Sequence, residues 1–173
     1  LRELEPHIII HLASSRNRLS FMGINNDDLS AELQMETNII LASAKLHDLR
    51  LFLNFGTADM LSTNGCVVSD PDAFHPRTPY SWIKSTSTNL VGALNRSVEF
   101  PGITLIPSLV YGPEQTQDMF VPGLIVSLLQ EQEFEMTAGT QIRDMIYIDD
   151  LITFIITIIE KPIPLLGQNI LVG

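Results

Sequence analysis

The sequence predicts an α/β fold in which helices cover the faces of a parallel β-sheet. Short apolar runs at residues 7–12, 49–55 and 103–110 have the length and composition of buried parallel strands. Longer segments with helical features, residues 28–47 and 80–100, separate these runs, and this alternation is typical of a parallel sheet. The chain has 173 residues, of which 45% are hydrophobic, so it is long enough to bury a core as one domain.

Caps, turns and prolines set the limits of these elements. Asp27 or Asp28 can cap the first helix, and Asp149 or Asp150 can cap the last one. Pro107 interrupts the third strand and makes its later half irregular. In chain order we expect strand 7–12, a polar loop at 16–26, a helix ending near 47, strand 49–55, a loop at 61–79, helix 80–100, strand 103–110, a turn at 111–113, helix 119–130, short strands at 134–137 and 142–148, a helix ending near 160 and strand 169–173.

Composition excludes several classes of function. The net charge of −10 leaves no basic stripe for nucleic-acid phosphates. Cys66 is the only cysteine, so the chain has neither an intramolecular disulfide nor a cysteine zinc site, and a reducing cytoplasm is the natural location. The four histidines have no metal-ligand spacing. The longest strongly apolar run, residues 151–159, is too short to cross a bilayer, and no secretory signal opens the chain.

The strongest chemical signal is the segment from Tyr80 to Lys84. Residues four apart on a helix project from one face, and an ammonium beside a phenol favours the phenolate, so Tyr80 can act as a base. Ligands of parallel sheets bind beyond the carboxyl ends of the strands, where Thr57 and residues 13–14 and 110–112 fall. A Thr57 hydroxyl can hold a substrate oxygen there. The alternative is a surface helix that carries an incidental Tyr-Lys pair.

These segments together resemble the extended short-chain dehydrogenase/reductases, in particular the NAD-dependent epimerase/dehydratase family that acts on nucleotide sugars. The resemblance runs from about residue 7 to residue 173. It rests on Ile9-Ile10-His11-Leu12-Ala13-Ser14, Glu36-Thr37-Asn38-Ile39, Phe55-Gly56-Thr57, Tyr80 to Lys84, Val110-Tyr111-Gly112-Pro113 and Arg143-Asp144-Met145-Ile146-Tyr147-Ile148-Asp149-Asp150.

The resemblance implies a Rossmann-like doubly wound sheet that binds NAD or NADP. Residues 1–113 would be the remainder of the NAD(P)-binding domain, and residues 114–173 a partial substrate-binding region interleaved with the last strands. It also implies a homodimer that pairs through helices 28–47 and 80–100. The glycine-rich fingerprint that cradles the pyrophosphate is absent, and both ends of the chain resemble cuts in a larger domain. We therefore expect this chain alone to bind the cofactor poorly or not at all.

The site roles are carried over from the family, position by position. The acid/base would be Tyr80, Lys84 would favour its ionisation and hold the nicotinamide ribose, and Thr57 would position the reacting hydroxyl. Arg143 would bind the nucleotide diphosphate, with an ion pair to Asp144 as the alternative. The resemblance thus implies catalysis by Thr57, Tyr80 and Lys84, cofactor contacts from Leu12, Ala13, Ser14, Asn38, Tyr80 and Lys84, and substrate contacts from Thr57, Val110 and Arg143, with no metal.

The residues after Thr57 bear on the reaction. Dehydratases of this family place two carboxylates there, whereas this chain has Ala58 and Asp59. We therefore expect a nucleotide-sugar 4-epimerase or 4-ketoreductase. A 4,6-dehydratase is one alternative, and a non-catalytic binding module is another, because Ile106 and Leu109 replace polar residues that the family often carries.

Overall fold

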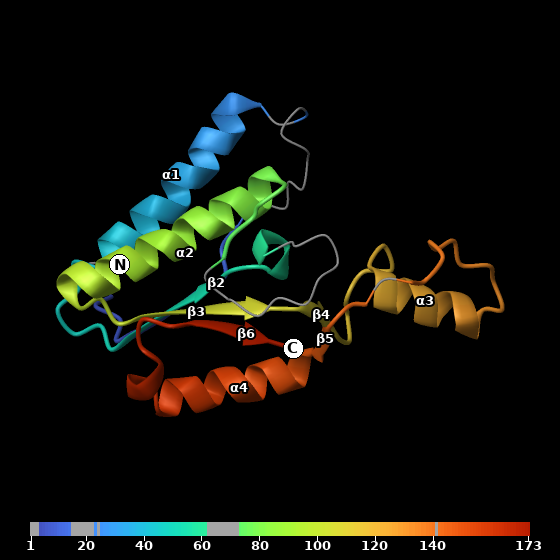
Figure 1. Cartoon of the computed structure of the whole chain (residues 1–173). Helices are drawn as coiled ribbons and strands as arrows, with labels where there is room; N and C mark the ends of the chain where they lie inside the picture. Colours follow the sequence, from blue (N-terminus) through green and yellow to red (C-terminus); the bar gives the residue numbers. More distant parts are fainter. Residues whose placement is uncertain (1–3, 15–22, 24, 62–72, 141) are drawn as a thin grey trace.

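A four-stranded, fully parallel sheet forms the centre of the molecule, in the order β1-β2-β3-β6 (Figure 1). The structure is a computed structural model that describes residues 4–14, 23, 25–61, 73–140 and 142–173. A second, two-stranded parallel sheet consists of β4 and β5. The strands are β1 (Ile8–His11), β2 (Leu51–Phe55), β3 (Gly102–Pro107), β4 (Leu109–Tyr111), β5 (Met145–Tyr147) and β6 (Asn169–Val172).

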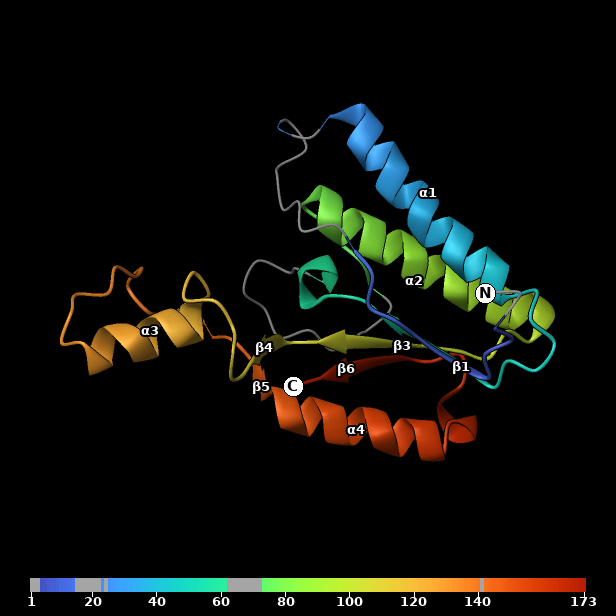
Figure 2. The same cartoon turned by 180° about the vertical axis from the view of Figure 1, so that it is seen from behind.

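Helices cover both faces of the four-stranded sheet (Figures 1 and 2). Helices α1 (Asn26–Ser43) and α2 (Pro79–Val98) lie side by side on one face, and α4 (Ile148–Glu160) lies on the other. Helix α3 (Phe120–Leu129) projects away from the sheet. Two short 3₁₀ helices, η1 (Ala58–Leu61) and η2 (Ile163–Leu165), complete the described elements. The predicted Rossmann-like α/β class is confirmed.

The core has one apolar layer on each face of the sheet. Phe52 packs with Ile40 of α1 and Val91 of α2 on one face. On the other face, Leu53 and its neighbours pack against Ile158 of α4. All five residues of β2 are buried, because neighbouring strands and helices on both faces surround it. This arrangement holds the carboxyl ends of β1, β2 and β3 at one edge of the sheet.

The caps of the first and last helices differ from the prediction. Asn25 caps α1, because its side chain accepts a hydrogen bond from the backbone N–H of Asp27 at 2.7 Å. Helix α4 begins at Ile148 without a side-chain cap, and Asp149 and Asp150 lie in its first turn. There the carboxylates interact favourably with the positive end of the helix dipole, but they accept no capping hydrogen bond from the helix start. The expected capping by Asp27 or Asp28 and by Asp149 or Asp150 was therefore wrong.

Most predicted strands and helices are present, with small shifts at their ends. Pro107 ends β3 and separates it from β4, as predicted. The strand expected at 134–137 is absent from the described residues, because Phe134 instead packs its ring on Phe120 of α3, with centroids 5.7 Å apart. Parts of the expected loops at 16–26 and 61–79 lie outside the described residues. None of the described helices has both the length and the apolar character needed to cross a membrane.

Candidate active site

The segment that follows β1 lies beside the two helices on one face of the sheet. Strand β1 ends at His11, whose Cα pairs with that of Asn54 in β2. Leu12 and Ala13 are exposed at this strand end, and Ser14 is half-buried. The Ser14 hydroxyl donates a hydrogen bond of 3.0 Å to a carboxylate oxygen of Glu32 on α1. The predicted cofactor-side residues 12–14 therefore form an open stretch of backbone tied to α1.

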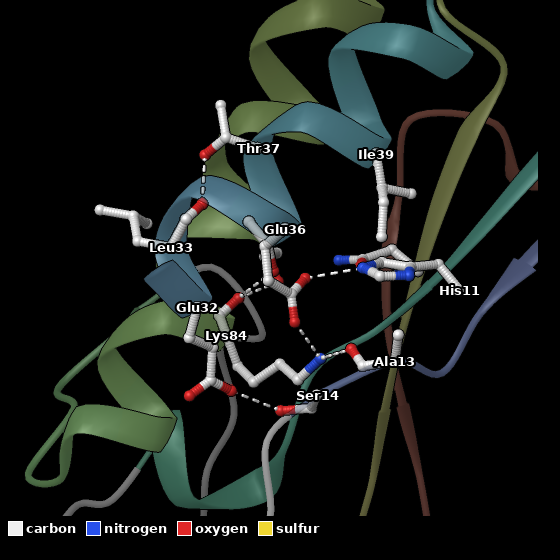
Figure 3. A network of polar contacts seen from close by, with 12 residues as sticks. His11, Ala13, Ser14, Glu32, Leu33, Glu36, Thr37, Ile39 and Lys84 are labelled. Carbon is white, nitrogen blue, oxygen red and sulfur yellow. Dashed lines mark hydrogen bonds and ion pairs between the residues drawn. The ribbon is translucent and has the colours of Figure 1, made fainter. Parts of the chain in front are cut away.

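Lys84 reaches from α2 to this strand end (Figure 3). Its Nζ donates to the backbone oxygen of Ala13 at 3.4 Å and to Oε1 of Glu36 at 2.7 Å. Lys84 is only 2% exposed and Glu36 only 1%. The ammonium is thus fixed between β1 and α1, although its own backbone belongs to α2.

Glu36 also binds His11, so one carboxylate joins three elements. Nε2 of His11 lies 2.7 Å from Oε2 of Glu36. Burial alone would raise the pKa of Glu36, but the His11 hydrogen bond and the Lys84 charge outweigh it and lower that pKa. The carboxylate is therefore ionised at neutral pH and only accepts hydrogen bonds, which places a proton on His11 Nε2.

Tyr80 and Thr57 lie near the start of α2. Tyr80 is half-buried in the first turn of α2, one turn before Lys84. Thr78 and Ser81 close this helix start with reciprocal hydrogen bonds, a capping box that fixes its first turn. Thr57 is half-buried directly before η1, which contacts α2, and its hydroxyl oxygen accepts the backbone N–H of Asp59 at 3.3 Å.

Lys84, Glu36 and His11 form one buried cluster, the Lys84 cluster, and the remaining predicted site residues lie outside it. Asn38 is exposed on α1, because it lies two residues beyond Glu36 and points away from the buried face. Val110 lies in β4, opposite Ile146 of β5. Arg143 is exposed two residues before β5, and among the described residues it forms no ion pair with Asp144. The pairing of β4 with β5 thus brings the Val110 and Arg143 segments together, separately from Lys84.

Sequence reasoning did not predict the roles of Glu36 and His11. The signal for Glu36 was its spacing: Glu32, Glu36 and Ile40 lie four residues apart and so share the buried face of α1. His11 was considered only as a metal ligand, for which its spacing is unsuitable, and the structure shows it buried. No group of His, Cys, Asp and Glu side chains among the described residues could hold a metal ion.

Known proteins with similar sequences and structures cover nearly all of this chain. It is 28% identical over 167 residues to the uncharacterized UDP-glucose epimerase YtcB of Bacillus subtilis strain 168, covering 96% of this chain and 52% of YtcB. A UDP-glucuronic acid 4-epimerase from Bacillus cereus, solved with UDP-glucuronic acid and NAD, superposes with a TM-score of 0.82 at 24% identity, covering 98% of this chain and 55% of that one. The dTDP-glucose 4,6-dehydratase DesIV from Streptomyces venezuelae, solved with NAD bound, gives 0.78 at 17% identity, covering 99% and 53%.

The solved structures support the fold of this chain, and the family model shows the family to which it belongs. The chain spans about half the length of YtcB and of both solved enzymes. The model of the NAD dependent epimerase/dehydratase family matches residues 1–173. The chain belongs to the NAD dependent epimerase/dehydratase family.

Proposed function

We propose that this chain supplies the proton-transfer residues of an NAD(P)-dependent nucleotide-sugar 4-epimerase or 4-ketoreductase. One observation carries the proposal: the Lys84 ammonium is held at the Ala13 carbonyl, directly after β1 and one helical turn from Tyr80. This is the edge of a parallel sheet where ligands bind.

The residues at this edge fit the ribose end of a nicotinamide dinucleotide. Leu12 is 66% exposed and Ala13 is exposed, so their backbone is open to a ligand. An ammonium has three N–H donors, and Lys84 uses two of them on Ala13 and Glu36, which leaves one for a ribose hydroxyl. When bound, the cofactor supplies the hydride acceptor or donor.

Within this chain, Tyr80 would take or return the proton of the sugar 4-hydroxyl. A phenol near an ammonium ionises more readily, and Lys84 lies on the same helix face, one turn away. The Thr57 hydroxyl accepts the Asp59 N–H, so its own proton remains to be donated to the substrate oxygen. Positioned groups of this kind contribute through proximity as well as through proton transfer.

The substrate we propose is a sugar linked to a nucleotide diphosphate. Arg143 is exposed, and guanidinium groups bind phosphate in a bidentate manner. Val110, half-buried in β4, would line the same region. We also propose a homodimer through α1 and α2, where Met35 and Leu41 of α1 and Val98 of α2 remain exposed.

A product assay tests the reaction. The 173-residue chain is incubated with NAD⁺ or NADP⁺ and UDP- or dTDP-hexoses, and the products are identified by NMR. We expect C4 epimers, or reduction of a 4-keto sugar by the reduced cofactor. Turnover should be lost in Tyr80→Phe and Lys84→Met. It should be unchanged in Lys161→Met, since Lys161 is exposed and lies after α4.

Three outcomes would overturn this proposal. Unchanged turnover in Tyr80→Phe would remove the acid/base assignment. A 4-keto-6-deoxy product would identify a dehydratase instead. Nucleotide-sugar binding without any redox chemistry would identify a binding module, the alternative that the apolar Ile106 and Leu109 suggested.

A further inference from the structure

We infer that Glu36 is a positioning residue that keeps Lys84 protonated and fixed at the end of β1, with His11 holding Glu36 in turn. The inference rests on the proposed function, in which Lys84 acts on Tyr80 and on the cofactor ribose. In this assignment Glu36 exchanges no proton with the substrate. It acts through Lys84.

The first argument is burial. Lys84, Glu36 and His11 are 2%, 1% and 3% exposed. A buried ammonium without a counter-charge either gives up its proton or moves toward water. The Glu36 carboxylate, 2.7 Å from Nζ, is the one acidic group that pairs with Lys84 among the described residues. Without Glu36, the ammonium of Lys84 would keep one partner among the described residues, the uncharged backbone oxygen of Ala13 at 3.4 Å.

The second argument is charge balance within the cluster. The charges of Glu36 and Lys84 compensate each other, and His11 contacts the second oxygen of the same carboxylate. Its Nε2–H donates a hydrogen bond to the second carboxylate oxygen, so Glu36 is held by His11 of β1 and by Lys84 of α2 (Figure 3).

The neighbouring charged groups do not substitute for Glu36. Besides Lys84, the charged residues on the elements packed around the cluster are His11 on β1, Asp27, Asp28, Glu32 and Glu36 on α1, Arg96 on α2 and Asp59 on η1. Asp27 and Asp28 are exposed in the first turn of α1, and Arg96 lies in the last turn of α2, three turns beyond Lys84. Glu32 lies one turn from Glu36 on the same face, but its carboxylate accepts the Ser14 hydroxyl. Asp59 is exposed in the first turn of η1. Glu32 therefore offers a matched control, with the same charge on the same helix face and a different partner.

The third argument is position. Lysine has a flexible four-carbon side chain, so the Tyr-x-x-x-Lys spacing alone does not fix where the ammonium lies. Contacts from α1 and β1 fix it beside Ala13 with one N–H still to donate. Loss of Glu36 would both free the side chain and discharge it.

The test measures the reactivity of each lysine amine, because only the neutral amine is acylated. The chain has three lysines, and Lys45 and Lys161 are exposed internal standards. The folded protein is treated with a trace of acetic anhydride over a series of pH values, and labelling at each lysine is measured by peptide mass spectrometry. In the parent chain, we expect Lys84 to be labelled far more slowly than Lys45.

Three substitutions make the result specific. In Glu36→Gln, labelling of Lys84 relative to Lys45 should rise by about tenfold or more near neutral pH, the effect of one unit in proton affinity. In Glu32→Gln, which removes the same charge one turn away, the ratio should stay at the parent value. In Glu36→Asp, which keeps the carboxylate, most of the protection should return. Circular dichroism and a thermal melt establish that each labelled variant is folded.

Two results would overturn the inference. One is a Lys84 ratio in folded Glu36→Gln equal to that of the parent. The other is an equal rise in Glu32→Gln, which would indicate general loosening of α1. If Glu36→Gln does not fold, His11→Gln takes its place, because loss of the partner of Glu36 should give a smaller rise in the same ratio, and an unchanged ratio there would also refute the inference.

A cofactor titration separates this inference from the proposed function. NADH fluorescence is followed with the parent, Glu36→Gln and Glu32→Gln as the pH is raised. We expect the affinity of Glu36→Gln to fall more steeply with rising pH than that of the other two, because its Lys84 discharges earlier. If no chain binds NADH, the proposed function fails, while the labelling ratio still decides the role of Glu36.

Discussion

The buried ion pair makes a quantitative prediction for stability. Glu36→Leu leaves the Lys84 ammonium, 2% exposed, without its counter-charge, and removal of one partner of a buried pair costs about 3–5 kcal/mol. Lys84→Met should cost a similar amount, because it leaves the carboxylate with His11 alone. The double variant Glu36→Leu/Lys84→Met removes both charges, so we expect it to lose only about 1–3 kcal/mol, the penalty for the unpaired His11 N–H.

Urea unfolding at neutral pH, followed by circular dichroism, measures these differences. With an m-value of about 2 kcal/mol per molar urea, each single variant should move the midpoint down by about 2 M, and the double variant by about 1 M. Lys161→Met, which removes an exposed charge, should stay within about 0.5 kcal/mol of the parent. If the double variant lost the sum of the two single losses, the charges would not be coupled, and our account of the cluster would be refuted.

Three further predictions follow from single contacts. The native pKa of Glu36 is lowered, so its ionised form stabilises the fold fully above the ordinary glutamate pKa. This contribution to stability disappears as the pH falls through the lower native pKa. The difference in urea midpoint between the parent and Glu36→Gln should therefore be constant near neutrality and shrink in acid. Gly112→Ala should cost about 1–3 kcal/mol in thermal melts, because the new Cβ would overlap Cγ2 of Ile148, and Ile148→Ala should recover part of that loss. Thr78→Ala should cost about 0.5–2 kcal/mol in urea unfolding, because it removes the side-chain acceptor for the Ser81 N–H, and a loss near zero would contradict the capping role.

Regular patterns explain why most of the fold could be predicted from the sequence. Continuous apolar runs report strands buried on both faces, and β2 is such a strand, with every residue buried. The segment at 134–137 alternates apolar and polar residues, which also indicates a strand, yet Phe134 packs on the projecting helix α3 and forms no strand. Local pattern does not report whether a partner strand is present, and only the tertiary structure supplies one.

Helix caps were predicted less well for a related reason. Asn25, Asp27 and Asp28 can all accept a backbone N–H at a helix start, so composition alone does not choose among them. The backbone direction at Asn25, which is extended, decides in its favour. A difference of two or three residues at a helix start does not alter which face of the helix is buried, so the predicted fold was unaffected.

The candidate site shows where a resemblance between segments stops being sufficient. The resemblance of the segment from Glu36 to Ile39 implied a cofactor contact from Asn38, but helix geometry turns Asn38 toward solvent and Glu36 toward Lys84. Resemblance compares residue types, whereas the side that a residue faces depends on how α1 packs on α2. The buried, four-residue spacing of Glu32, Glu36 and Ile40 carried this information in the sequence.

The Tyr-x-x-x-Lys spacing therefore specifies less than it suggests. It places Tyr80 and Lys84 on one face of α2, but the charge and position of the ammonium are set by Glu36 from α1 and by the Ala13 carbonyl after β1. A carboxylate 2.7 Å away also offsets part of the positive field that the ammonium exerts on its surroundings. The same cluster thus holds Lys84 in place and limits how strongly it acts on Tyr80. If the proposed chemistry is correct, substitutions in α1 that move Glu36 will change catalysis as directly as substitutions in α2, although no residue of α1 belongs to the motif.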